Sequence, residues 1–112
     1  MAEFFQTEYA DITIVAYGCV ARSAKRAVIE AREKGIKVGL LKLVTLWPFV
    51  RSAIEKVLQT SKTLLVPEMN MGQLSREVKR VNRGVARVLT LNKVDGTIIT
   101  PEEISTRIAE VS

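Results

Sequence analysis

The stretch at residues 67–73, PEMNMGQ, carries the residue types best suited to a site. Its carboxylate has two open roles: proton transfer, or accepting hydrogen bonds from the following helix's amides, the role we favour. Its asparagine and glycine tolerate positive φ and can turn the chain. Its two methionines are adaptable apolar side chains, suited to a protein contact. We predict a partner-facing loop made of Glu68, Met69, Asn70, Met71, Gly72 and Gln73.

Two further loops carry reactive or large side chains. Cys19, after Gly18, is either a thiolate at a helix start or a small buried residue, the alternative we favour. Trp47 and Phe49 flank a proline. They either cover the end of a sheet or anchor a partner, because exposed aromatic side chains are costly without one.

The composition excludes several kinds of site. The 112 residues contain no histidine, so this chain alone cannot form a Ser-His-Asp or a Cys-His catalytic centre. It contains one cysteine, so it cannot form an internal disulfide. A metal site is not expected, and no glycine-rich phosphate-binding motif is present. No apolar run is long enough to span a membrane, and the first residues lack the apolar core of a signal peptide. We expect a cytoplasmic protein without membrane contact.

The chain is basic, with a net charge of +5. Arg76, Arg80 and Arg83 recur at helical spacing and form a candidate basic face. Such a face is either simply solvated or contacts an acidic partner. No aromatic residue interleaves with these charges, so nucleic acid is not an expected partner.

Apolar patterning indicates how these loops are positioned. Nearly continuous apolar runs predict four strands, at 11–17, 36–43, 63–66 and 86–91. Apolar residues at helical spacing predict four helices, three between the strands and one after the last strand. Gly35 should end the first helix and Gly84 the third. A capping box that begins at Thr100 should start the last helix. Val15 in the first strand and Val81 on the stripe of the third helix should be buried, and Val85 should belong to the same stripe as Val81.

Strands that alternate with helices predict an α/β fold with three α/β/α layers, a parallel sheet and one domain at 1–112. The most apolar strand, the first, should be central, which gives the order 2-1-3-4. Residues 3–6 can add an antiparallel edge strand beside strand 2. The order reverses between strands 1 and 3, so the loops after Tyr17 and Val66 should meet at the carboxyl edge, where ligands bind in such sheets.

Four segments together resemble a known family: DITIVAYG, AREKGIKVGLLKLVTLWPF, LLVPEMNMGQLSREVKR and DGTIITPEEI. They are similar to the transketolase C-terminal-like domain of 2-oxoacid:ferredoxin oxidoreductases, in particular the C-terminal region of the 2-oxoglutarate-type α subunit. The resemblance covers about residues 10–108. Two alternative families are the E1 β chains of 2-oxoacid dehydrogenases and the transketolases, whose equivalent C-terminal domains share part of this pattern. Those E1 β chains have Pro-x-Asp at the helix entry, whereas Phe49 and Val50 follow Pro48 here, which favours the ferredoxin-linked branch.

The resemblance implies a part in a larger enzyme. Such enzymes decarboxylate a 2-oxo acid with thiamine diphosphate, pass electrons through iron–sulfur clusters to ferredoxin, and transfer the acyl group to coenzyme A. Other domains or subunits hold those cofactors, so the resemblance implies that this chain binds none alone and serves in assembly. Its partners are the other domains or subunits, with ferredoxin an indirect one. A free-standing α/β module that binds a small ligand is a further alternative.

Overall fold

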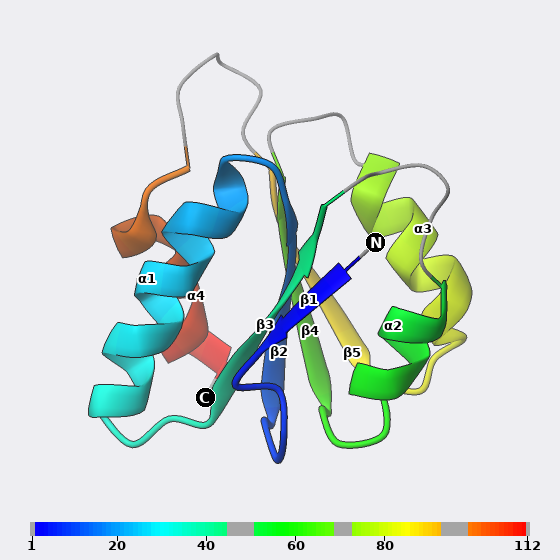
Figure 1. Cartoon of the computed structure of the whole chain (residues 1–112), viewed down its shortest axis with the longest axis horizontal. Helices are drawn as coiled ribbons and strands as arrows, with labels where there is room; N and C mark the ends of the chain where they lie inside the picture. Colours follow the sequence, from blue (N-terminus) through cyan, green and yellow to red (C-terminus); the bar gives the residue numbers. More distant parts are fainter. Residues whose placement is uncertain (1, 45–50, 69–72, 93–98, 112) are drawn as a thin grey trace.

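The computed structural model describes residues 2–44, 51–68, 73–92 and 99–111. It forms three layers, with a twisted sheet between two pairs of helices (Figure 1). The strands are β1 Ala2–Phe5, β2 Ile12–Tyr17, β3 Val38–Leu43, β4 Thr63–Glu68 and β5 Arg87–Asn92. The helices are α1 Val20–Glu33, α2 Arg51–Val57, α3 Gln73–Asn82 and α4 Pro101–Val111. Helices α1 and α4 cover one face of the sheet and α2 and α3 the other.

The sheet order is β1-β3-β2-β4-β5. β2, β3, β4 and β5 are parallel, and β1 pairs antiparallel with β3 at one edge. The predicted order 2-1-3-4 and the antiparallel edge strand are both confirmed. The central strand β2 is buried along its first five residues, as a strand covered on both faces requires.

Each face of the sheet builds its own apolar core, because successive residues of a strand point to opposite faces. Ile14 packs with α1 and α4, whereas its neighbour Val15 packs with α2 and α3. Both side chains are fully buried, and Val81 is 9% exposed in the second core, so the two predicted core valines are confirmed.

The predicted helix ends are confirmed at two places. Gly35 has a φ of +83°, and its N–H donates to the Arg32 carbonyl at 3.0 Å, which closes α1. At the start of α4 the Thr100 hydroxyl accepts from the Glu103 N–H at 3.2 Å. The Glu103 carboxylate in turn accepts from the Thr100 N–H at 3.0 Å, which completes the capping box.

The third helix ends earlier than predicted. α3 stops at Asn82, and Val85 is 67% exposed rather than part of the apolar stripe. The cause is the Asn82 side chain, which is buried and forms two hydrogen bonds with the Ala86 backbone, at 2.7 and 2.8 Å. Gly84 takes the positive φ of +80° that the resulting turn needs.

The third strand runs further than predicted. It was predicted to end at Val66, just before Pro67, but β4 continues to Glu68 and pairs with β5 through Asn92. β2 pairs with β4 only as far as Leu65, so Pro67 lies where β4 has a neighbour on one side alone. A proline fits there because its missing N–H is not required by a second strand.

Gly39 allows the connection between β1 and β2 to cross close over β3. A Cβ built at Gly39 would lie 2.6 Å from the Gln6 carbonyl oxygen and 2.7 Å from the Thr7 Cα. Both contacts are to backbone atoms, so the steric clash of an added Cβ can be relieved only if the connection itself moves.

Replacing Gly39 with alanine is therefore expected to lower the free energy of unfolding by about 1–3 kcal/mol, because it overpacks this crossing. Chemical denaturation followed by circular dichroism measures the change. Lys37→Ala, at an exposed side chain just before β3, is the control and should fall within about 0.5 kcal/mol of wild type. Equal stability of the Gly39→Ala protein and wild type would show that the connection does not cross here.

Candidate functional site

The predicted switch point lies between β2 and β4, which are neighbours in the sheet. The carboxyl ends of the parallel strands share the upper edge of the molecule in Figure 1. β2 ends there at Tyr17, and β4 ends at Glu68. The two sequence segments predicted to meet at this edge therefore follow neighbouring strands.

Glu68 is the best-defined polar group at this edge. It is 4% exposed, and its carboxylate oxygens accept hydrogen bonds from the Leu74 and Ser75 N–H groups, each at 3.0 Å. α3 begins at Gln73, so the carboxylate satisfies two of the unpaired amides at the start of this helix and interacts favourably with its dipole. This is the hydrogen-bonding role favoured from the sequence. Both oxygens are engaged in holding the end of β4 to the start of α3.

The turn after β2 is built by Gly18 and Cys19. Gly18 has a φ of +67°, and Cys19 precedes the first residue of α1 without a capping hydrogen bond from its side chain. Cys19 is exposed, so the prediction of a buried thiol is wrong. The first turn of α1 directs Val20 and Ala21 into the core instead, and Cys19 falls just outside that buried stripe.

The candidate basic face lies on the outer side of α3 and in the turn that follows. Arg76, Arg80 and Arg83 are all exposed, while Leu74 and Val78 pack inward against the sheet. Arg80 forms an ion pair with Glu77 one turn earlier. The predicted separation of a basic side from an apolar side on this helix is present.

Several predicted site residues lie outside the described part of the chain. They are Trp47, Phe49, Met69, Asn70, Met71 and Gly72. Gln73 is described only as the first residue of α3. The role of these residues as an interface therefore stays a prediction.

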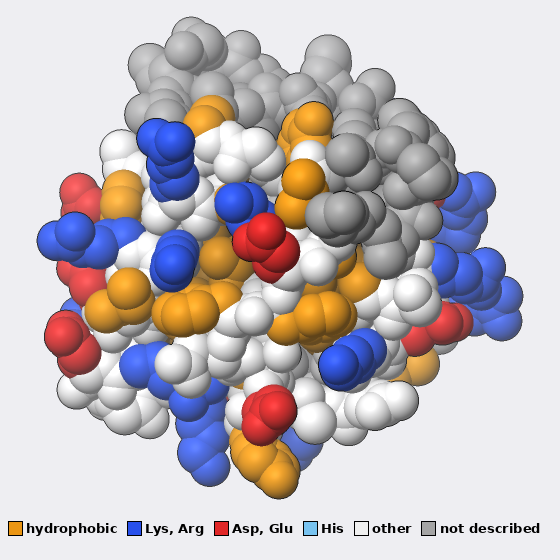
Figure 2. Space-filling model, in the orientation of Figure 1, with side chains coloured by type: hydrophobic (Ala, Val, Ile, Leu, Met, Phe, Trp, Pro, Cys, Tyr) orange, Lys and Arg blue, Asp and Glu red, His pale blue; other side chains and the backbone are white. Residues whose placement is uncertain are grey.

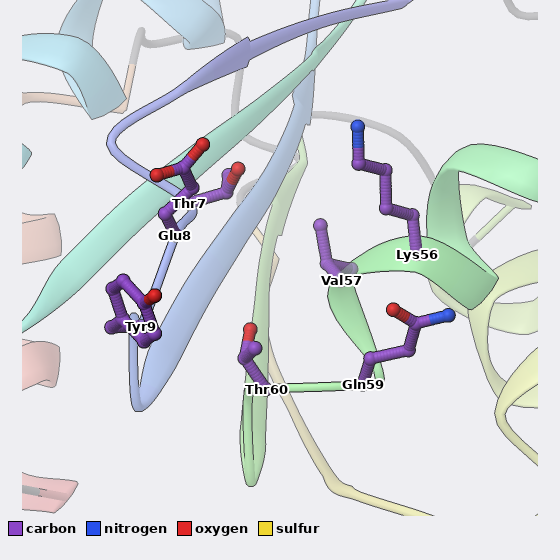
Figure 3. Close-up of a pocket in the computed structure, with 7 residues that line it drawn as sticks. All are labelled: Thr7, Glu8, Tyr9, Lys56, Val57, Gln59 and Thr60. Carbon is purple, nitrogen blue, oxygen red and sulfur yellow. The ribbon is translucent and has the colours of Figure 1, made fainter.

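The hollows found among the described residues lie away from this edge. One, of about 340 Å³, lies between the β1–β2 turn and the α2–β4 turn and is lined by Thr7, Glu8, Tyr9, Lys56, Val57, Gln59 and Thr60 (Figure 3). Lys56 points away from Tyr9 and Thr60 in this view, so the polar groups do not converge. Sequence reasoning did not mark this hollow, because its residues come from two turns without a recognisable motif.

Within residues 2–44, 51–68, 73–92 and 99–111, no three or more His, Cys, Asp or Glu side chains group as they would around a metal ion. No helix within these ranges is long and apolar enough to cross a membrane.

The sequence is similar to subunits of 2-oxoacid oxidoreductases. The ketoisovalerate oxidoreductase subunit VorB of Methanothermobacter marburgensis is 37% identical over 110 residues, which are 98% of this chain and 31% of that protein. The 2-oxoglutarate synthase subunit KorA of the same organism is 44% identical over 102 residues, 91% of this chain and 27% of that protein. The chain thus spans less than a third of the length of either relative.

Solved structures share the fold. 2-Oxoglutarate:ferredoxin oxidoreductase from Magnetococcus marinus matches with a TM-score of 0.81 at 24% identity, over 98% of this chain and 19% of that one. A split-gene transketolase matches with a TM-score of 0.77 at 20% identity, over 89% of this chain and 37% of that one. The transketolase C-terminal-like architecture is confirmed by these matches. Residues 10–104 match the family model described as pyruvate:ferredoxin oxidoreductase core domain II, and the chain belongs to that family.

Proposed function

We propose that this chain is an assembly domain of a thiamine-diphosphate-dependent 2-oxoacid:ferredoxin oxidoreductase and does not catalyse the reaction alone. The observation that carries the proposal is the 44% identity to a 2-oxoglutarate synthase subunit over 91% of the chain. The complete enzyme would convert a 2-oxo acid and coenzyme A to acyl-CoA and carbon dioxide, and would pass two electrons to ferredoxin. We also propose that the protein is cytoplasmic and that residues 1–112 form one domain.

The residues of this chain do not fit an iron–sulfur cluster, and the start of α3 does not fit a diphosphate. An iron–sulfur cluster is held by several cysteines, and the chain has one. A diphosphate would suit the first amides of a helix at the carboxyl edge, but those of Leu74 and Ser75 already bind the buried Glu68 carboxylate. We therefore assign thiamine diphosphate, the clusters and coenzyme A to other domains or subunits, and no chemical step to this chain.

The switch-point loops are the proposed contact with those cofactor-carrying parts. Glu68 supports this role, because its two hydrogen bonds hold the end of β4 to the start of α3. A loop whose ends are held loses less conformational freedom when it binds. The residues proposed to make the contact are Gly18, Cys19, Trp47, Phe49, Met69, Asn70, Met71, Gly72 and Gln73.

Native mass spectrometry of the complex purified through this chain tests the proposal. Co-purification of a thiamine-diphosphate-binding chain together with iron–sulfur proteins is the expected result. A lipoyl acyltransferase in their place would identify the chain as the equivalent domain of a 2-oxoacid dehydrogenase. A homogeneous free chain that a small molecule stabilises in a thermal-shift screen would favour a free-standing ligand-binding module.

The double substitution Met69→Ser with Met71→Ser is expected to weaken binding to the thiamine-carrying subunits by about 1–3 kcal/mol, because it removes two apolar contact side chains. Isothermal titration calorimetry with the separately purified subunits measures this. The melting temperature of the substituted chain should stay within a few degrees of wild type. Unfolding of the chain with binding spared would show that the methionines belong to the core.

A further inference from the structure

Most of the net charge of this protein is concentrated in one short segment. Residues 76–87 contain five cations and a single carboxylate, a net charge of +4, against +5 for the whole chain. The cations are Arg76, Lys79, Arg80, Arg83 and Arg87. We call these five side chains, together with Val85, the basic surface.

All five cations are exposed. Four of them lie along the outer side of α3 and in the turn that follows it, and Arg87 is the first residue of β5, next to Val88, which packs toward α3. Arg76 and Arg83 are seven residues apart, which corresponds to roughly 10 Å along a helix. Lys and Arg side chains gather over α3 at the right-hand edge of Figure 2. The four cations of α3 and its turn therefore form a continuous surface, and Arg87 follows them in the sequence.

Internal ion pairs leave this surface largely uncompensated. Within the described ranges, Arg80 is the one cation of the five that forms an ion pair, with Glu77. Other helices mix their charges: Arg51 pairs with Glu55 on α2, and Arg107 with Glu110 on α4. Like charges four residues apart on a helix repel each other and destabilise it. Arg76 and Arg80 on α3 have this spacing. Solubility alone does not require such a concentration of one sign, because mixed charges also provide it.

The neighbouring side chains favour a protein partner over nucleic acid. Val85 is 67% exposed between Arg83 and Arg87, and an apolar side chain in this position suits a pocket on a protein surface. No aromatic residue occurs within 73–87, so the surface offers nothing on which a base could stack. A second copy would bring the same cations face to face in a two-fold contact, which repulsion disfavours.

We propose that the basic surface docks a protein surface that carries clustered carboxylates and an apolar residue positioned to receive Val85. Four of the five cations are arginines, whose planar guanidinium groups bind carboxylates with two parallel hydrogen bonds. This contact is separate from the switch-point loops: it extends along the outer side of α3 and past its carboxyl end. This contact does not require the proposed enzyme, because the charge and exposure of this chain alone support it.

The test uses a fluorescent glutamate-rich peptide that contains leucine, titrated with the full chain at low salt and followed by fluorescence anisotropy. Arg76→Glu with Arg83→Glu is the test variant. Arg22→Glu with Arg26→Glu, at two exposed positions of α1, is the matched control because it changes the net charge equally. We expect the test variant to bind at least about tenfold more weakly and the control less than about threefold, since only the first removes close charge pairs. Circular dichroism checks that both variants are folded.

Val85→Ser separates the apolar contribution from the charge. It should weaken binding of the leucine-containing peptide about threefold and leave binding of polyglutamate unchanged, because the cations remain. Equal loss in the test and control variants would overturn the proposal by showing that the peptide senses net charge alone. So would no binding at low salt, or tighter binding to an oligonucleotide or to anionic vesicles at the same salt concentration.

Discussion

Glu68→Ala is expected to lower the free energy of unfolding by about 2–5 kcal/mol, because it leaves two amide groups at the start of α3 without their acceptor. Both hydrogen bonds are buried, so water cannot simply replace the carboxylate. Glu68→Gln retains one acceptor oxygen and is expected to cost about half as much. Urea denaturation followed by circular dichroism measures the free energy of unfolding of wild type and of both variants.

Glu55→Ala is the control for the removal of a carboxylate. Glu55 forms an exposed ion pair with Arg51, so its loss should change stability by no more than about 0.5 kcal/mol. Glu68→Ala and Glu55→Ala proteins of equal stability would contradict the assigned role of Glu68. The expected difference rests on burial and on the two hydrogen bonds, since both variants lose the same charge.

Ile14→Ala is expected to destabilise the protein by about 2–5 kcal/mol, because it opens a cavity in the central strand that the surrounding helices only partly close. Ile14 is fully buried against α1 and α4. Thermal and urea denaturation measure the loss. Val81→Ala, which empties a smaller space in the core on the other face, should cost about 1–3 kcal/mol.

Ile29→Ala tests whether burial is the cause. Ile29 lies on α1 and is 43% exposed, so the same truncation should cost less than about 1 kcal/mol. A loss at Ile29 that equals the loss at Ile14 would show that residue type, rather than the position of β2 in the sheet, sets the effect.

The order of the sheet could be predicted from the sequence because the signals were local and agreed with one another. The apolar run that became β2 indicated a central strand, and the Gly35 and Thr100 signals marked true helix ends. Where prediction failed, the deciding contact was not local. Pro67 stays in a strand only because β2 stops pairing with β4 at Leu65, and no property of the proline reveals that.

The candidate site was predictable in position but only partly in detail. Sequence placed Glu68 at the switch point and named helix capping as its favoured role, because a carboxylate just before a helix commonly accepts its free amides. Cys19 was wrongly expected to be buried, since a shift of one residue at the start of α1 decides whether its side chain enters the core. Val85 was misplaced because the hydrogen bonds between Asn82 and Ala86 end α3, and apolar spacing does not report them.

The antiparallel strand β1 has a consequence for how the chain acquires its structure. Its residues precede their partners in the chain by more than thirty positions, with Phe5 paired to Leu40 and Ala2 to Leu43. The parallel pairs are also distant in sequence, with Ile12 opposite Thr63 across the centre of the sheet. Proteins dominated by such non-local pairings fold slowly, because the entropy of closing long loops is lost before any strand contact forms. During synthesis on a ribosome, β1 must therefore remain unpaired until β3 has left the exit tunnel.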